Sequence, residues 1–117
     1  HIPDKKYVYY LAHSHYKDLI SNGIEIYEYT PGFVHAKMFV SDDMKAEGDT
    51  INLDFRSLYL HWEDAVYVYG NSVVHSVEKD FVETLSKCQK ISLEDCKKFP
   101  LFDKVAGKIL RLIAPLM

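Results

Sequence analysis

Residues 33–41 alternate between two kinds of position. Every second side chain in this run is apolar: Val34, Ala36, Met38 and Val40. The positions between them include His35 and Lys37. Successive side chains of a β-strand point to opposite faces, so the pattern predicts a strand in which His35 and Lys37 project from the same face.

The first three quarters of the chain predict a helix, several short strands and a second helix. Apolar residues recur at helical spacing over residues 5–21, which end at Asn22-Gly23, and again over residues 72–87. Strands are predicted over residues 24–29, 45–51 and 61–69, and a short helix or loop over residues 52–60. A short turn at Thr30-Pro31-Gly32 predicts that strands 24–29 and 33–41 are neighbours in one sheet.

The last quarter predicts two more helices. The Ser-x-x-acid pattern from Ser92 to Asp95 starts one helix, Phe99-Pro100 ends it, and residues 103–113 form another. The amphipathic stretch 104–117 would either lie on a membrane or pack its apolar face on the sheet. Packing is favoured because cationic residues are few. Together these elements predict an α/β fold, a mixed sheet with helices on both faces.

The composition is that of one ordinary globular domain, predicted to span residues 1–117. The sequence is 48% hydrophobic and 26% charged, with a net charge of −3. This mildly acidic balance argues against nucleic acid as a partner. The pattern of residues predicts no signal peptide at the start of this sequence, and no apolar run approaches the roughly 20 residues that span a bilayer. His1 is interpreted as a tag remnant, and the chain as a soluble piece of a longer protein.

The cysteines and the first two histidines do not predict a metal site. Cys88 and Cys96 lie in a region that is predicted to be helical, and free thiols in a reducing compartment are favoured over a disulfide. His13 and His15 stand two apart on a helix and face different directions, so both are interpreted as surface or boundary residues. No metal and no cofactor are expected.

His35 and Lys37 together suit the chemistry of a phosphate ester. An imidazole can attack phosphorus or move a proton, and a neighbouring ammonium stabilises the charged oxygens. An isolated His-x-Lys is also common on ordinary strands, so the pair alone does not establish a site. Further polar residues follow it along the chain: Asp42, Thr50, Asn52, Asp54, Arg56, Ser57 and Glu63.

Taken together, these residues resemble the HxKxxxxD motif of the phospholipase D superfamily. The resemblance is strongest to the carboxy-terminal HKD half-domain of bacterial cardiolipin synthases, in the segments GIEIYEYTPGFVHAKMFVSDD and TINLDFRSLYLH. It runs from about Tyr7 to the end of the chain. The α/β/α phospholipase D fold that it implies agrees with the predicted elements.

The resemblance implies a role for each matching residue. His35 would be the acid/base imidazole, with Glu63 as the carboxylate that orients it. Lys37 and Asn52 would bind phosphoryl oxygens, beside Thr50. Asp42 would act directly or as a structural partner of the motif, and Arg56 would reach the lipid headgroup. The alternative for Asp54, Arg56 and Ser57 is a capped turn with a local Asp–Arg pair, which is favoured for Asp54.

The implied reaction is phosphatidyl transfer between two phosphatidylglycerol molecules through a phosphohistidine, giving cardiolipin and glycerol. The second His–Lys pair would come from the amino-terminal HKD half of the parent chain or from a homodimer mate. The parent would sit at the cell membrane, attached through segments outside this chain and with its catalytic part on the cytoplasmic side. The alternatives are an inactive isolated half-domain and a homodimeric phosphodiesterase or nuclease of the same superfamily.

Three acidic residues depart from the family pattern. Glu47 stands at an expected apolar position, Asp49 at an expected glycine, and Asp64 at a position that is usually small or apolar. Burying such a carboxylate without a partner would be costly. Either these positions face water because the partner half is absent, or the sequence was altered to make a lone half soluble.

Overall fold

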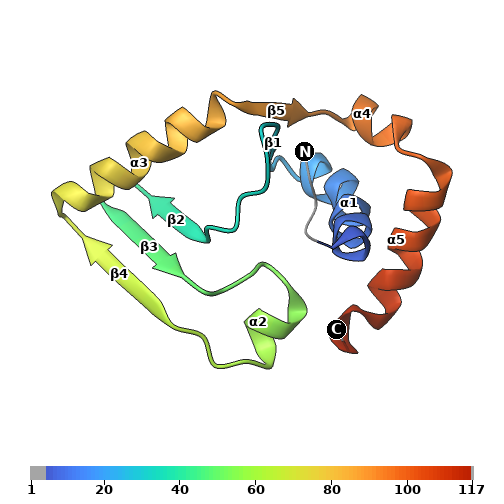
Figure 1. Cartoon of the computed structure of the whole chain (residues 1–117), viewed down its shortest axis with the longest axis horizontal. Helices are drawn as coiled ribbons and strands as arrows, with labels where there is room; N and C mark the ends of the chain where they lie inside the picture. The colour runs from blue at the N-terminus through green and yellow to red at the C-terminus, as the bar shows by residue number, and fades with distance from the viewer. Residues whose placement is uncertain (1–4, 117) are drawn as a thin grey trace. The chain divides into compact units, whose positions relative to one another are not determined.

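The computed structural model describes residues 5–116, which divide into two compact units. The first unit joins the part of the chain up to Phe33 with the part from Cys88 onward, and the second runs from Val34 to Lys87. Each unit is described by itself. Figure 1 shows the helices and strands of both. The α/β class predicted from the sequence is confirmed, while the single domain over residues 1–117 stays a prediction.

The first unit is built on helix α1, Lys6–Ser21, which packs against two helices from the end of the chain. These are α4, Leu93–Lys98, and α5, Leu101–Ile113, which is followed by the short 3-10 helix η1, Ala114–Leu116. Two short strands, β1 (Ile26–Tyr29) and β5 (Cys88–Ile91), pair in antiparallel fashion with Ile26 opposite Ile91. The buried Ile91 and Cys96 belong to the core of this unit.

Three predictions about the elements of this unit are wrong. Strand β1 pairs with β5 and not with the strand that follows the Thr30-Pro31-Gly32 turn, and Cys88 lies in a strand rather than in a helix. The apolar face of the terminal stretch does not pack on a sheet, because α5 packs on α1. Both cysteines are free thiols, as predicted.

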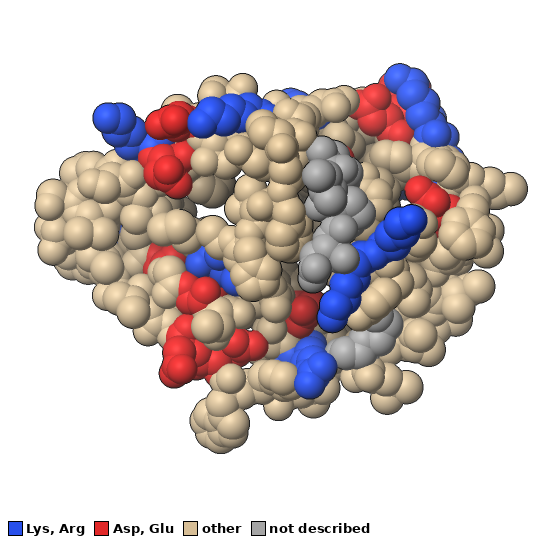
Figure 2. Space-filling model, in the orientation of Figure 1, with Lys and Arg blue, Asp and Glu red and all other residues tan. Residues whose placement is uncertain are grey.

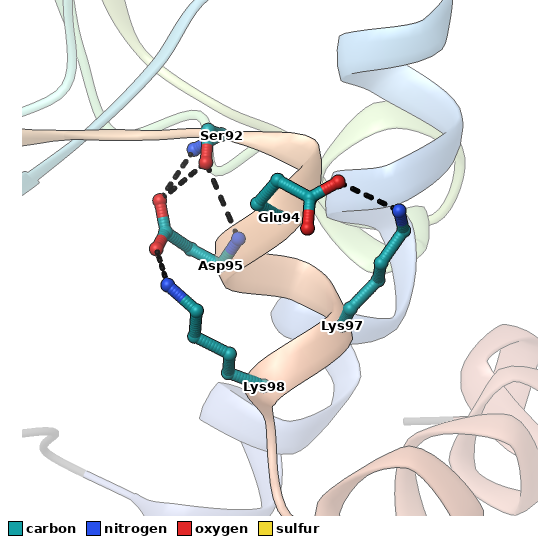
Figure 3. A network of polar contacts seen from close by, with 5 residues as sticks. All are labelled: Ser92, Glu94, Asp95, Lys97 and Lys98. Atoms are coloured by element: carbon teal, nitrogen blue, oxygen red, sulfur yellow. Dashed lines mark hydrogen bonds and ion pairs between the residues drawn. The ribbon is translucent and has the colours of Figure 1, made fainter.

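Local sequence signals explain where α4 begins and ends. The Ser92 hydroxyl accepts a hydrogen bond from the Asp95 amide at 3.2 Å, and the Asp95 carboxylate accepts one from the Ser92 amide at 3.0 Å (Figure 3). This capping box confirms the start predicted from the Ser-x-x-acid pattern. Two lysines, Lys97 and Lys98, pair along the helix with Glu94 and Asp95, and Phe99-Pro100 separates α4 from α5.

His13 is buried among polar and aromatic side chains, contrary to the prediction that it is a surface or boundary residue. Its residue is only 8% exposed, its ring stacks on Phe99 with centroids 4.1 Å apart, and its Nε2 lies 3.0 Å from a Glu28 carboxylate oxygen. The hydroxyl of Tyr16 donates to the same oxygen at 3.0 Å. Glu28 on β1 therefore joins the strand to two residues of α1.

The half-buried Tyr16–Glu28 pair predicts alkaline sensitivity. Burial first, and then the charge of Glu28, raise the pKa of Tyr16 well above its ordinary value. An unfolded tyrosine ionises near pH 10, so its contribution to stability is present below pH 10 and is lost as the pH rises above it. Tyr16→Phe is expected to lower the free energy of unfolding at pH 7 by about 1 kcal/mol and to flatten its fall between pH 9 and 11.

The measurement for Tyr16 is urea unfolding at several pH values. The control is Tyr27→Phe, because the Tyr27 hydroxyl donates to the exposed Glu25 at 2.8 Å. We expect that control to leave the alkaline slope unchanged. An equal slope in wild type and Tyr16→Phe would contradict the prediction.

The second unit is a three-stranded antiparallel sheet with one helix packed on it. The strands are β2 (Met38–Ser41), β3 (Lys45–Asp49) and β4 (Ala65–Tyr69), with β3 in the middle. Helix α3, Ser72–Leu85, packs against all three strands, and a short helix α2, Phe55–Tyr59, lies between β3 and β4. The five strands therefore form two antiparallel sheets, whereas the sequence predicted a single mixed one.

A row of small apolar residues forms the core of the second unit. Ala46 is opposite both Val40 and Val68 in the strand register, so all three lie on one face of the sheet. Ala46 is 4% exposed, and Val74 on α3 is 1% exposed. The opposite face carries the row Phe39, Glu47 and Tyr67, in which Phe39 is 40% and Tyr67 60% exposed.

Candidate functional site

The candidate residues of the second unit, apart from Asp42, lie at or beside one end of its sheet. At this end β2 begins, β3 ends and β4 begins, so three chain segments lie side by side. The amide of Asp49 donates to the carbonyl of Lys37 at 3.0 Å, and the amide of Thr50 donates to the carbonyl of Asp64 at 3.1 Å. These two hydrogen bonds continue the strand ladder beyond its regular part and fix the register of the segments.

His35 and Lys37 lie next to each other, as their spacing predicted. The Lys37 ammonium is 3.1 Å from Nδ1 and 3.3 Å from Nε2 of His35, and it donates to the His35 carbonyl at 2.9 Å. The regular strand β2 begins only at Met38, so both residues precede it in an extended segment. The predicted strand over residues 33–41 was therefore too long at its start, although the side chains of His35 and Lys37 lie next to each other.

Glu63 joins the segment before β4 to residues after β3. Its carboxylate accepts hydrogen bonds from the hydroxyls of Thr50 and Ser57. These two bonds, Thr50 first, hold the pKa of Glu63 below its ordinary value, and the charges of His61 and Lys37 act in the same direction. Glu63 is consequently an ionised carboxylate near Lys37 at neutral pH.

Asn52 and the short helix α2 complete this end of the sheet. The Asn52 amide nitrogen is 3.5 Å from the Ser57 hydroxyl, and the Asp54 carboxylate caps α2 by accepting from the Ser57 amide at 2.8 Å. The cap predicted for Asp54 is confirmed. The predicted local Asp–Arg pair is wrong, because Arg56 donates from Nε to His61 Nε2 at 2.5 Å.

Asp42 lies in the hairpin turn at the other end of β2. Asp42 and Asp43 have φ values of 56° and 53°, the left-handed region that aspartate tolerates better than most residues. The Asp42 carboxylate accepts from the Ser41 hydroxyl at 3.0 Å and lies 3.8 Å from the Lys45 ammonium. The structure therefore separates Asp42 from His35 and Lys37 by the length of strand β2.

The three acidic residues that depart from the family pattern, Glu47, Asp49 and Asp64, differ in their exposure and contacts. Asp49 accepts from the Ile51 amide at 2.7 Å through one carboxylate oxygen, and its other oxygen is buried without a hydrogen-bond partner. Glu47 is half-buried between Phe39 and Tyr67, and Asp64 is exposed. Among residues 5–116, no three His, Cys, Asp or Glu side chains are grouped so as to hold a metal ion.

Comparison with known proteins identifies the family. A family model described as cardiolipin synthase, PLD-like domain matches residues 1–85. An uncharacterized protein of Streptococcus mutans is 44% identical over 99% of this chain and 25% of its own length. Cardiolipin synthases of Clostridium perfringens and Geobacillus kaustophilus are each 35% identical over 98% of this chain, and over 24% and 23% of their own lengths.

The comparisons also show how much of its relatives the chain covers. It spans about a quarter of the length of the curated relatives that it matches. No solved structure matches it. Within residues 5–116, no helix is both long enough and apolar enough to cross a bilayer. By the family model and the curated relatives, the chain belongs to the cardiolipin synthase family of PLD-like domains.

Proposed function

We propose that this chain is the carboxy-terminal catalytic part of a cardiolipin synthase, which transfers a phosphatidyl group from one phosphatidylglycerol to another. The observation that carries the proposal is the juxtaposition of His35 and Lys37, whose side chains are 3.1 Å apart. A carboxylate, Glu63, and an amide, Asn52, lie on the segments that border the same end of the sheet. This set supports phosphoryl chemistry without a metal ion.

His35 is proposed to act as acid and then as base. In the first step, an imidazole of the amino-terminal half of the parent attacks phosphorus, and the bond from phosphorus to the glycerol oxygen breaks. His35 gives its proton to that leaving oxygen. In the second step, His35 takes the proton from the glycerol hydroxyl of a second phosphatidylglycerol, whose oxygen attacks phosphorus and breaks the phosphorus–nitrogen bond.

The residues around His35 would bind the phosphoryl group and headgroup of the lipid and orient the imidazole. Lys37 and Asn52 would hold the phosphoryl oxygens, with Thr50 next to them, and Glu63 would stabilise the imidazolium form of His35. Arg56, on the exposed helix α2, would reach the glycerol headgroup. Asp42 would act indirectly, since its contacts in the hairpin turn are with Ser41 and Lys45.

This chain alone is proposed to be inactive, because one His–Lys pair supplies only half of the two-histidine chemistry. The second candidate function is a phosphodiesterase or nuclease completed by a homodimer. The net charge of −3 argues against a nucleic-acid substrate. Figure 2 agrees with this, because acidic and basic side chains are interspersed on the face that it draws.

The test is a chimera in which this chain replaces the matching quarter of the Clostridium perfringens cardiolipin synthase, to which it is 35% identical. We expect the chimera to form cardiolipin from phosphatidylglycerol and the isolated chain to form none. Light scattering on the isolated chain gives its mass in solution. A dimer of the isolated chain that cleaves a phosphodiester would favour the second candidate, and a folded but inactive chimera would overturn the proposal.

A further inference from the structure

Helix α5 approaches α1 closely at Gly107, its Phe102 ring contacts the Tyr10 ring with centroids 5.8 Å apart, and most of its other large apolar residues are exposed. Gly107 is buried against α1, and a Cβ atom at this position would lie 2.6 Å from the Tyr10 carbonyl oxygen and 2.8 Å from the Ser14 Cβ. The two helices are therefore so close at Gly107 that no larger side chain fits between them.

The outward side carries a continuous apolar stripe. Its members in α5 follow one another at intervals of three or four residues, which places them on one face, and an exposed leucine of η1 continues them: Leu101, Val105, Ile109, Leu112 and Leu116. Leu101 is 78%, Leu112 82% and Leu116 87% exposed. We call these five residues the outer stripe. Burying such side chains is strongly favourable, so the outer stripe is a docking surface.

A row of cations runs along one flank of the outer stripe. Lys104, Lys108 and Arg111 also follow at intervals of four and three, one helical position away from the stripe. They line a groove of about 630 Å³ within the first unit, between α1, α4 and α5. Two further lysines line the same groove, Lys17 on α1 and Lys97 on α4.

Three of these five cations have partners within the first unit, and two have none among the described residues. Arg111 pairs with Asp18 at 2.9 Å, Lys97 pairs with Glu94 at 2.7 Å, and Lys104 donates to the Lys97 carbonyl at 2.6 Å. Lys17 and Lys108, by contrast, make no hydrogen bond or ion pair within the part of the chain that the structure describes. The groove is also lined by three carboxylates, those of Asp18, Glu94 and Asp103, so its five cations leave an excess of positive charge beside the apolar stripe.

We propose that α5 is an interfacial helix that docks this chain on an anionic phospholipid membrane. The outer stripe would enter the boundary between headgroups and acyl chains, and the cationic flank would contact the phosphates. We favour an anionic bilayer over a protein surface as the partner, because its charge and its apolar interior complement an apolar stripe with cations along one flank. The choice of lipid rests on the proposed function, whose substrate is itself an anionic membrane lipid.

The experiment is flotation of the chain with vesicles, measured by the protein fraction that rises with the lipid. One set of vesicles is phosphatidylcholine alone, and the other contains phosphatidylglycerol as well. Wild type is expected to bind the anionic vesicles and to bind the neutral ones at least tenfold more weakly. Leu101→Ser and Leu112→Ser are each expected to weaken binding to the anionic vesicles about tenfold.

The controls are matched in exposure. Leu53 in the second unit is 80% exposed, so Leu53→Ser removes an equally exposed leucine that does not belong to α5 and should leave binding unchanged. Lys108→Gln should weaken binding to the anionic vesicles only, whereas Lys79→Gln on α3 should not. Far-UV circular dichroism of each variant verifies that the fold is retained, as expected for exposed positions.

Three outcomes would overturn the inference. The first is an absence of wild-type binding to either kind of vesicle. The second is equal binding by wild type and the two α5 leucine variants. The third is a dimer in solution that becomes a monomer in Leu112→Ser, which would make a second copy the occupant. A folded chimera that forms no cardiolipin, together with an isolated chain that still rises with the anionic vesicles, would sink the proposed function and leave this inference intact.

Discussion

Replacing His35 with alanine in the chimeric synthase is expected to lower the rate of cardiolipin formation by about 10²–10⁴-fold. This is the range that a positioned acid/base group contributes. The residue is exposed, so its loss should not disturb the fold. Lys37 would remain beside the phosphoryl oxygens, and the KM for phosphatidylglycerol should consequently change much less than kcat.

A second variant tests whether Glu63 acts through the His35 imidazole. Glu63→Gln keeps the shape of the side chain and removes the charge, so it should lower kcat by less than His35→Ala does. The double variant should be no slower than His35→Ala alone if Glu63 acts only through the imidazole. Fully additive losses would show that Glu63 does not act through His35. An unchanged kcat in His35→Ala would remove His35 from the chemistry.

Replacing Gly107 with alanine is expected to destabilise the first unit by about 1–3 kcal/mol, although alanine ordinarily favours a helix over glycine by about 1 kcal/mol. The added Cβ would meet the Tyr10 carbonyl oxygen at 2.6 Å, a backbone atom that no rotamer change can move. Helices α1 and α5 would have to separate. This would also strain the ion pair between Arg111 and Asp18.

The measurement for Gly107 is urea unfolding followed by circular dichroism. Gly48→Ala on β3 is the control, since a Cβ there would meet no atom within 4 Å. That variant should be as stable as wild type or slightly more stable. If Gly107→Ala proved equally stable, α1 and α5 would not pack as closely in solution as the structure has them.

The sequence predicted well those features that depend on near neighbours in the chain. The alternation around His35 and Lys37 placed the two side chains together even though regular strand structure begins only at Met38. The caps of α2 at Asp54 and of α4 at Ser92 followed from side chains within three residues. Such features follow from local backbone geometry, which a short stretch of sequence specifies.

Features that depend on distant partners were missed. The pairing of Ile26 with Ile91 joins residues far apart in the chain, and β5 has only four residues with no clear period. The burial of His13 required Glu28 and Phe99, which come from two other segments. For α5, the sequence predicted an amphipathic helix. It did not predict that the side containing Gly107 packs on α1, because that contact depends on how closely the two helices approach each other.

The hydrogen bond from the Asp49 amide to the Lys37 carbonyl has a kinetic consequence. It ties the segment that carries His35 to the end of β3, so the two part only when the sheet opens locally. The deuterium-exchange rate of this one amide therefore reports how often the His–Lys pair comes apart from the residues beyond β3. If that opening is rare, the site keeps its geometry, and the proposed catalytic pair needs no reordering when a lipid arrives.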